Sequence, residues 1–281
     1  MSSPPLHPLN RAFQWTSRRG PYRRLRPEQA RGYDNDGFFL LEDAFDPETL
    51  HELQDAIDPI EAQVEKFLAS REDGKLFIAR SGEITFTTHM VTRSKRCRSF
   101  CSGPVFRDLA HDLIGPDVRL YWDQAVYKKP GTRDEFPWHQ DNGYTFIEPQ
   151  QYLTCWVALT DANEENGCPW VVPGNHLLGT LEHQMTDLGW RCLEKPEGAV
   201  PVPARAGSIV VFSSLTPHRT GPNLSEDVRK AYIVQFAPDG AHLRSPNDDS
   251  YETCDAPERQ FLVLENGSPP GPSDARPQPT E

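Results

Sequence analysis

The sequence predicts a helical N-terminal third that supports a C-terminal β-barrel or β-sandwich. Two observations carry this prediction. Before residue 118, apolar residues recur at helical spacing. From Val118 onward, short runs of β-branched and aromatic residues alternate with clusters of glycine, proline and asparagine, which is typical of antiparallel β folds. A chain of 281 residues is long enough to form one such domain around a single core.

The N-terminal third contains one predicted strand and two predicted helices. The strand is expected over Gly37–Leu41. Asp46 followed by Pro47 is typical of a helix start, with the aspartate as the cap. Pro59 should kink that helix or split it in two, and its apolar face is expected to hold Leu50, Leu53, Ile57, Ile60, Val64 and Phe67. A second helix is expected from about Pro104 to Ile114.

The C-terminal part contains four clear candidate strands and no internal repeat. Turn clusters such as Gly221–Ser225 separate them. The strands are expected over Val118–Tyr127, Tyr152–Thr160, Ser208–Ser214 and Lys230–Phe236.

Both ends of the chain differ in composition from the middle. Residues 1–31 are rich in proline and hold seven arginines against one glutamate, and prolines are dense again after Gly267. We therefore expect a Pro/Arg-rich lead over 1–31, a single domain over 32–265 and a disordered tail over 266–281, with both ends contributing little to the barrel. The lead suits either an arm for nucleic acid or lipid or, as the favoured interpretation, a solvated tail that folds over an acidic body.

Charge and cysteine content limit the function classes. The net charge is −12, and the lead contributes +6, so the remaining chain carries −18. An acidic body argues against non-specific binding of nucleic acid or anionic membranes. No apolar run approaches the roughly 20 residues that span a bilayer, and no signal-peptide stretch is present, so a cytoplasmic protein is expected. The six cysteines show neither a close CxxC pair nor a secreted framework, and we expect free thiols.

The sharpest local feature is the tripeptide His139-Gln140-Asp141. On an extended segment, residues two apart point to the same face, so His139 and Asp141 should converge while Gln140 points away. One imidazole and one carboxylate are two thirds of a two-histidine, one-carboxylate metal site, which leaves open positions for oxygen chemistry. Taken alone the tripeptide is weak, because a His–Asp hydrogen bond in a loop explains it equally well.

The third metal ligand must be another histidine, and His218 is the best candidate. It follows the predicted strand Ser208–Ser214 and lies 79 residues after His139, so a β-barrel can bring the two together. A plain loop histidine is the alternative. The remaining histidines need no functional explanation: we place His7, His51 and His111 in the lead or on helices, and His176 and His183 on the surface.

Arg229 follows His218 by eleven residues, with the strong turn Gly221-Pro222-Asn223 between them. The two residues are therefore expected on adjacent antiparallel strands near one end of the barrel. A guanidinium binds a carboxylate in a bidentate way, so Arg229 suits the far carboxylate of a 2-oxoacid that chelates a metal. The alternative is a surface arginine paired with Glu226 or Asp227.

Together these motifs resemble a known family. Residues 37–236 are similar to the phytanoyl-CoA dioxygenase-like branch of the iron(II)/2-oxoglutarate oxygenases, most densely in KKPG…FPWHQDNGYTFIEP, LTCWVALTDANEENGCPWVVPGNH and GSIVVFSSLTPHRTGPNLSEDVRKAYIVQF. The resemblance implies a double-stranded β-helix, or jelly roll, with N-terminal helices as a buttress. It also implies roles for named residues: iron ligands His139, Asp141 and His218, a 2-oxoglutarate salt bridge at Arg229, and further cosubstrate contacts at Trp156, Thr220 and Gln124.

The resemblance further implies an activity. Iron(II), 2-oxoglutarate and O2 would serve hydroxylation or desaturation of a small, apolar organic substrate, with release of succinate and CO2. Related halogenases have a small residue where Asp141 stands, so halogenation is disfavoured. Family members often hold 2-oxoglutarate with a lysine that residues 83–90 lack, where Thr87, Thr88 or His89 would have to substitute. Aromatic residues that would suit an apolar substrate are Trp138, Tyr144, Phe146 and Trp170.

Two other functions fit the same motifs. One is a non-catalytic barrel that binds a metal and a small ligand. The other is a metal-dependent cupin-type hydrolase or isomerase, which has no evident need for Arg229. The expected partner in each case is a small molecule, with no nucleic acid and no membrane span, and the sequence leaves the oligomeric state open.

Overall fold

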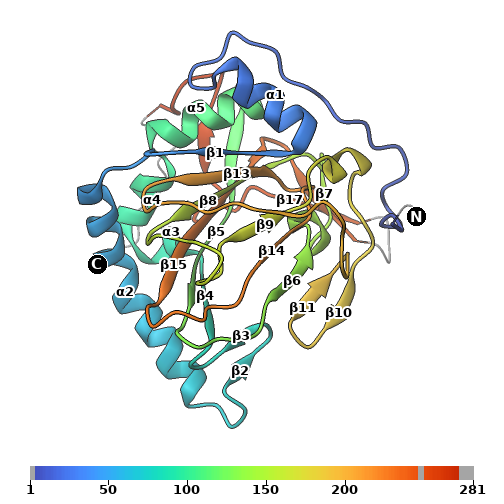
Figure 1. The fold of residues 1–281 in the computed structure, drawn as a ribbon. Helices are drawn as coiled ribbons and strands as arrows, with labels where there is room; N and C mark the ends of the chain where they lie inside the picture. Colours follow the sequence, from blue (N-terminus) through green and yellow to red (C-terminus); the bar gives the residue numbers. More distant parts are fainter. Residues whose placement is uncertain (1–3, 246–249, 272–281) are drawn as a thin grey trace.

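Two antiparallel sheets face each other in the structure, a computed structural model that describes residues 4–245 and 250–271 (Figure 1). The major sheet has the strand order β1-β13-β8-β15-β5-β4-β3-β2, with β18 also pairing with β5. Its strands are β1 (Phe38–Leu41), β2 (Lys75–Leu76), β3 (Ala79–Arg80), β4 (Ile84–Thr88), β5 (Val118–Lys128), β8 (Leu153–Ala158), β13 (Ile209–Ser213), β15 (Arg229–Pro238) and β18 (Leu262–Leu264).

The minor sheet and two small sheets complete the barrel. The minor sheet has the order β12-β9-β14-β6, and it contains β6 (Phe136–His139), β9 (Pro169–Val171), β12 (Val200–Pro201) and β14 (His218–Thr220). Strand β16 (His242–Arg244) pairs with β7 (Ile147–Glu148) and β17 (Tyr251–Thr253), while β10 (Gln184–Thr186) and β11 (Gly189–Arg191) form a hairpin. The predicted mainly β fold is confirmed, and the four predicted strands correspond to β5, β8, β13 and β15.

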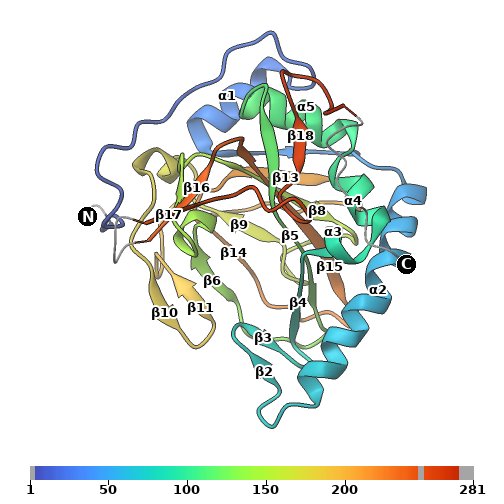
Figure 2. The same cartoon turned by 180° about the vertical axis from the view of Figure 1, so that it is seen from behind.

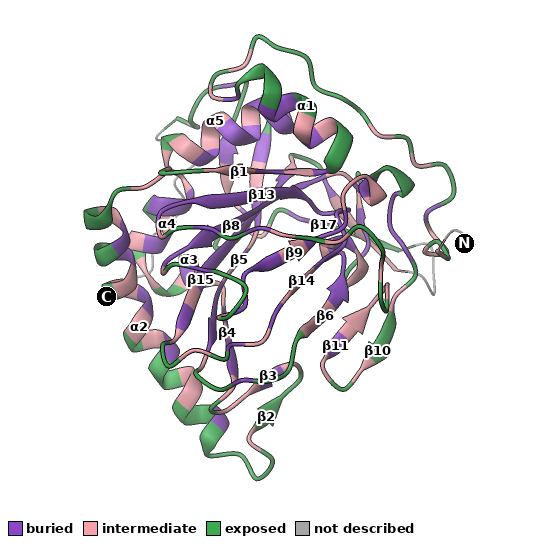
Figure 3. Cartoon of the chain, in the orientation of Figure 1, coloured by how far each residue is buried: buried purple, intermediate pink, exposed green. Residues whose placement is uncertain are grey.

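The central strands are buried on both faces, which explains their near-continuous apolar runs. Every residue of β8 and of β13 is buried (Figure 3). One face of the major sheet packs inside the barrel against the minor sheet, where Trp156 and Phe212 meet Val171. The other face packs against the helices, where Val211 and Val234 share a cluster with residues of the helical layer. The inner face is therefore the one that can carry a site.

In the part of the chain that the structure describes, five α-helices cover the outer face and one end of the major sheet (Figures 1 and 2). They are α1 (Pro27–Asp36), α2 (Pro47–Ala69), α3 (Met90–Arg93), α4 (Lys95–Cys101) and α5 (Pro104–Leu113). None of the helices in the described residues is long and apolar enough to cross a membrane. All six cysteines are free, as expected, and Cys97 and Cys101 are buried on α4.

The start of α2 is the predicted one, but Pro59 does not split the helix. The Asp46 carboxylate accepts a hydrogen bond from the Thr49 backbone N–H at 2.8 Å, and Pro47 occupies the first turn. The helix continues through Pro59 to Ala69. Beyond the proline, the predicted apolar face is only partly correct: Ile60 packs against the core, but Phe67 is 50% exposed and the carboxylate of Glu61 is buried.

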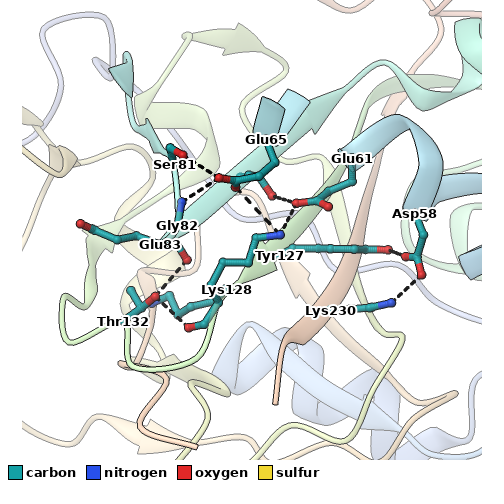
Figure 4. Close-up of polar contacts among 12 residues, drawn as sticks. Asp58, Glu61, Glu65, Ser81, Gly82, Glu83, Tyr127, Lys128, Thr132 and Lys230 are labelled. Carbon is teal, nitrogen blue, oxygen red and sulfur yellow. Dashed lines mark hydrogen bonds and ion pairs between the residues drawn. The ribbon is translucent and has the colours of Figure 1, made fainter. Parts of the chain in front are cut away.

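Three carboxylates on that part of α2 explain the changed face (Figure 4). Asp58, Glu61 and Glu65 follow each other at helical spacing and point at the sheet. Asp58 accepts hydrogen bonds from Tyr127 and from Lys230 (2.7 Å), while Glu61 receives the Lys129 ammonium at 2.6 Å. Further contacts come from the Thr85 hydroxyl to Glu61, and from Ser81 and Gly82 to Glu65. Polar contacts therefore fix this half of α2 where an apolar stripe was expected.

This cluster yields a stability prediction. Replacing Lys129 by methionine should lower the free energy of unfolding by about 3 kcal/mol, because it leaves the buried Glu61 carboxylate without its cation. Urea denaturation measures the change. In the double variant with Glu61→Gln the uncompensated charge is gone, so most of the loss should be recovered. A loss below about 1 kcal/mol for Lys129→Met would mean that the pair behaves as an exposed ion pair.

The Pro/Arg-rich lead lies against the body, and the expectation that it contributes little to the fold is wrong. In its first half, the buried Asn10 side chain donates to the carbonyls of Leu178 and Thr180, both at 2.9 Å. The buried Asp112 carboxylate of α5 accepts backbone hydrogen bonds from Arg23, Arg24 and Leu25 at 2.8–3.0 Å. Leu25 is 6% exposed and belongs to the core beneath the helices. A carboxylate surrounded by backbone donors holds this segment where composition alone indicated an extended tail. Residues 272–281 of the predicted tail lie outside the described residues.

Candidate active site

Three side chains from two neighbouring segments meet inside the barrel. Strands β6 and β14 are antiparallel neighbours, and their register places His218 directly opposite His139. Asp141 follows β6 at the start of a short 3-10 turn, Asp141–Gly143. One ligand atom from each of these residues lies within 4.8 Å of the other two. This separation suits three donors around one first-row metal ion.

Both imidazoles are oriented by the backbone. The Nδ1 atom of His139 lies 2.8 Å from the carbonyl oxygen of Pro137, and that of His218 lies 3.0 Å from the carbonyl oxygen of Thr216. A carbonyl only accepts, so each Nδ1 carries the proton and each Nε2 keeps its lone pair for a metal. Burial lowers the pKa of His139 to about 3 and that of His218 to about 4, so both rings are neutral at neutral pH.

Two residues of the major sheet hold the carboxylate. The Thr154 hydroxyl on β8 donates to the Asp141 Oδ2 atom at 2.5 Å, and the Gln235 amide on β15 donates to that hydroxyl at 3.3 Å. Burial raises the pKa of Asp141, and the nearby His139 and these hydrogen bonds oppose the rise. Sequence reasoning missed Thr154 and Gln235, since one polar residue within an apolar strand carries no signal of its own.

Gln140 points away from the metal ligands, as the alternation predicts. Its side-chain amide donates to the carbonyls of Gly179 and Leu215 at 3.0 and 2.6 Å. Its backbone N–H donates to His183 Nε2 at 2.9 Å. The prediction of surface positions is therefore wrong for His183, which fixes the metal-binding segment, and for His176, which is fully buried.

Arg229 is buried inside the barrel at the start of β15. It is 1% exposed, so the interpretation as a surface arginine paired with Glu226 or Asp227 is wrong. Its three guanidinium nitrogens have no hydrogen-bond partner among the described residues. The expectation of adjacent strands is also wrong: β15 pairs with β5 and β8 in the major sheet, whereas β14, which carries His218, belongs to the minor sheet. The two residues lie in different sheets because the turn between them crosses from one sheet to the other.

Trp156 connects the arginine to the metal ligands. The Arg229 guanidinium carbon lies 5.3 Å from the centre of the Trp156 ring. Trp156 and Thr154 are two residues apart on β8, so they share its inner face, and Thr154 contacts Asp141. Arg229, Trp156 and the carboxylate of Asp141 therefore follow one another along the inside of the barrel. Burial lowers the pKa of Arg229 to about 10, so the guanidinium keeps its charge at neutral pH.

A second buried cation lies beside Arg229. Lys128 is the register partner of Arg229 on β5, it is 1% exposed, and its ammonium donates to the carbonyls of Gly221 (2.6 Å) and Asp134 (3.2 Å). Burial, and next the charge of Arg229, lower the pKa of Lys128 to about 7. A lysine that helps to hold 2-oxoglutarate was expected only within residues 83–90, so Lys128 was not among the predicted site residues.

A cavity of about 580 Å³ opens from His139 and Asp141 towards the surface. Gln124 lines it, as does Thr88, the inward-facing member of the three proposed lysine substitutes. Thr87 faces the helical side of β4 by alternation, and His89 lies beyond the strand. Of the four aromatic residues expected near a substrate, Tyr144 lines the cavity, while Trp138 and Trp170 flank Arg219 and Phe146 stacks on His7.

Thr220 stands apart from the other predicted cosubstrate contacts. It ends β14 opposite Phe136 and is partly buried. Within the described residues its hydroxyl has no hydrogen-bond partner. The structure therefore leaves Thr220 free to contact a ligand without showing one for it.

Known proteins are similar to much of this chain. The family model described as phytanoyl-CoA dioxygenase (PhyH) matches residues 33–231, which include His139, Asp141, His218 and Arg229. The chain belongs to this family. The phytanoyl-CoA dioxygenase domain-containing protein 1 of Rattus norvegicus is a relative that is 25% identical over 282 residues, which cover 83% of this chain and 97% of the relative.

Further proteins that are similar to this chain carry names that state different activities. The ectoine dioxygenase of Bordetella parapertussis is 27% identical over 226 residues, covering 72% of this chain and 71% of that protein. A solved structure of the epimerase SnoN in complex with Fe3+, alpha ketoglutarate and nogalamycin RO superposes with a TM-score of 0.65 at 23% identity, covering 84% of this chain and 97% of that one. This structural likeness shows the shared fold, a jelly roll.

Proposed function

We propose that the chain is an iron(II)- and 2-oxoglutarate-dependent dioxygenase that hydroxylates a small organic substrate, with release of succinate and CO2. The observation that carries this proposal is the buried, unpaired Arg229 guanidinium in the same barrel interior as His139, Asp141 and His218. A buried charge is tolerated only when it is paired and hydrogen-bonded. A ligand carboxylate would complete the arginine, which fits a dicarboxylate cosubstrate.

The residues present fit both groups. Two neutral imidazoles and one carboxylate suit iron(II) and leave coordination positions open. The bound iron and 2-oxoglutarate would supply the oxidising power for the reaction with O2. The chain would supply placement: Arg229 binds the far carboxylate, Trp156 forms a wall beside it, and Gln124 and Thr220 offer polar contacts. Asp141 fills the position that a halide would need, which favours hydroxylation or desaturation over halogenation.

The cavity supports a small substrate with a largely apolar body. Its volume lies within the range of roughly 300–1,000 Å³ that is usual for small-molecule sites. His139 and Asp141 are part of its wall, so a molecule bound there would lie beside the metal. Aromatic side chains dominate the remaining wall, and they would keep water from the reacting atoms.

Anaerobic titration with iron(II), with and without 2-oxoglutarate, tests the proposal. A weak visible metal-to-ligand charge-transfer band should appear only when both are present, and exposure to O2 should then give succinate. Iron binding without the band and without succinate would favour the non-catalytic barrel. Because SnoN is an epimerase, the product should also be weighed by mass spectrometry: one added oxygen supports hydroxylation, and an unchanged mass contradicts it.

A further inference from the structure

The cavity beside the metal-binding residues has one strongly apolar wall. Phe77, at the turn between β2 and β3, lines it although the side chain is 62% exposed. Its φ of 54° is uncommon for a bulky residue, so the turn is held in a shape that presents this ring. An exposed aromatic ring at a cavity mouth gains from covering an apolar ligand. The other aromatic residues of the cavity are Phe86, Tyr121, Trp122, Phe136, Tyr144, Tyr152 and Trp190.

Arg259 also lines this cavity, in the turn between β17 and β18. Hydrogen bonds hold this turn in place: the backbone N–H groups of Arg259 and Gln260 both donate to the carbonyl of Ala256, at 3.1 and 2.6 Å. The Gln260 side chain donates to the carbonyl of Tyr121 at 3.5 Å, and the Arg119 guanidinium donates to the Gln260 carbonyl at 3.0 Å. These bonds to Arg119 and Tyr121 fix the turn beside β5, so the position of Arg259 does not depend on a ligand.

Among the residues that the structure describes, no carboxylate forms an ion pair with Arg259. Its guanidinium lies 3.5 Å from His89 Nε2. Burial first, and then the charges of Arg259 and Arg93, lower the pKa of His89, so this ring stays neutral. The His89 ring packs on Trp122 with 4.4 Å between ring centres. In a chain of net charge −12, a partly buried cation that faces a cavity and forms no ion pair with a described carboxylate indicates a site for an anion.

We propose that the substrate is an amphipathic organic acid, whose apolar body packs on the aromatic wall and whose carboxylate binds Arg259. This inference rests on the proposed function, because it assigns the substrate of the cavity that opens from His139 and Asp141. Glu252 also lines the cavity but is exposed on β17, so it stays hydrated at the rim. Arg259 would thus fix one end of the substrate in the same cavity that His139 and Asp141 line.

Calorimetric binding to the metal-free protein tests this inference with two probes of nearly equal shape, 1-naphthylacetate and the neutral 1-naphthylacetamide. The acid should bind about tenfold tighter or more, as expected for a charge-assisted contact. Arg259→Gln should remove this preference and leave the affinity for the amide unchanged. Arg244→Gln is the matched control, because Arg244 lies on β16, pairs with Glu148 and does not line this cavity. Glu252→Gln should keep the preference or increase it.

Several results would overturn the inference: equal binding of acid and amide, no binding of either, tighter binding of 1-naphthylmethylamine, or a preference that survives Arg259→Gln. The last result would place the anion elsewhere, for example at Arg229. Because the assay contains neither iron nor 2-oxoglutarate, it is independent of the proposed reaction. If no succinate forms, the proposed function is wrong, but the preference for acids still stands. If the preference for acids is absent, this inference is wrong, but the proposed function still stands.

Discussion

Replacing Asp141 by alanine should abolish substrate oxidation and weaken iron binding. Asp141 is the sole anionic member of the three-residue group, so the variant leaves two neutral imidazoles to hold a dication. Loss of a residue that merely supports a metal ligand costs about 10–100-fold in affinity or activity, so loss of the ligand itself should cost more. Succinate formation with substrate present and iron titration under anaerobic conditions measure the two effects.

The control for this prediction is a second aspartate that is close to Asp141 in the sequence but lies outside the site. Asp134 lies between β5 and β6, is exposed and pairs with Arg80, so Asp134→Ala should keep normal turnover. Thermal unfolding of the metal-free Asp141→Ala protein separates loss of function from loss of fold. Near-normal turnover of Asp141→Ala would remove this carboxylate from the site.

Arg229→Ala should raise the concentration of 2-oxoglutarate required for half-maximal rate by roughly 10²-fold or more. The magnitude follows from removing one partner of a buried charge pair, which costs about 2–5 kcal/mol. Arg229→Lys keeps the charge but loses the planar fork, so it should be a poor substitute. Iron binding without 2-oxoglutarate should change little, since the guanidinium is separated from Asp141 by Trp156 and Thr154.

Removal of the Arg229 guanidinium should also affect the stability of the protein less than an ordinary core substitution does. In the protein without a ligand the guanidinium is buried and unpaired, so its removal should not lower the free energy of unfolding as an ordinary core truncation does. Arg229→Met, which fills a similar volume, is the variant for this measurement. Unchanged dependence on 2-oxoglutarate in Arg229→Ala would separate Arg229 from the cosubstrate even if the metal site stands.

Local chemistry determined much of this protein in advance. The Asp46-Pro47 helix start, the four long strands and the opposite directions of His139 and Gln140 all follow from rules that act over a few residues. The combination of HxD, distal histidine and arginine identified the family, because that combination is far more specific than any of its parts. Where a local rule met a competing contact, it failed: Glu61 is buried among the apolar residues of α2 because Lys129 and Thr85 lie opposite it, while Phe67 is exposed.

Only the tertiary structure decided which distant residues meet. The packing of the two sheets face to face brings Thr154 to Asp141, while strand pairing within the major sheet brings Arg229 to Trp156 and Arg259 to His89. Sequence spacing does not encode such contacts, since the neighbours of a strand depend on how the chain crosses between sheets. For this reason the sequence placed His218 and Arg229 on adjacent strands, whereas their strands lie in opposite sheets. The sequence thus determined which residue types are available for the site, and the packing of the barrel determined how these residues are arranged.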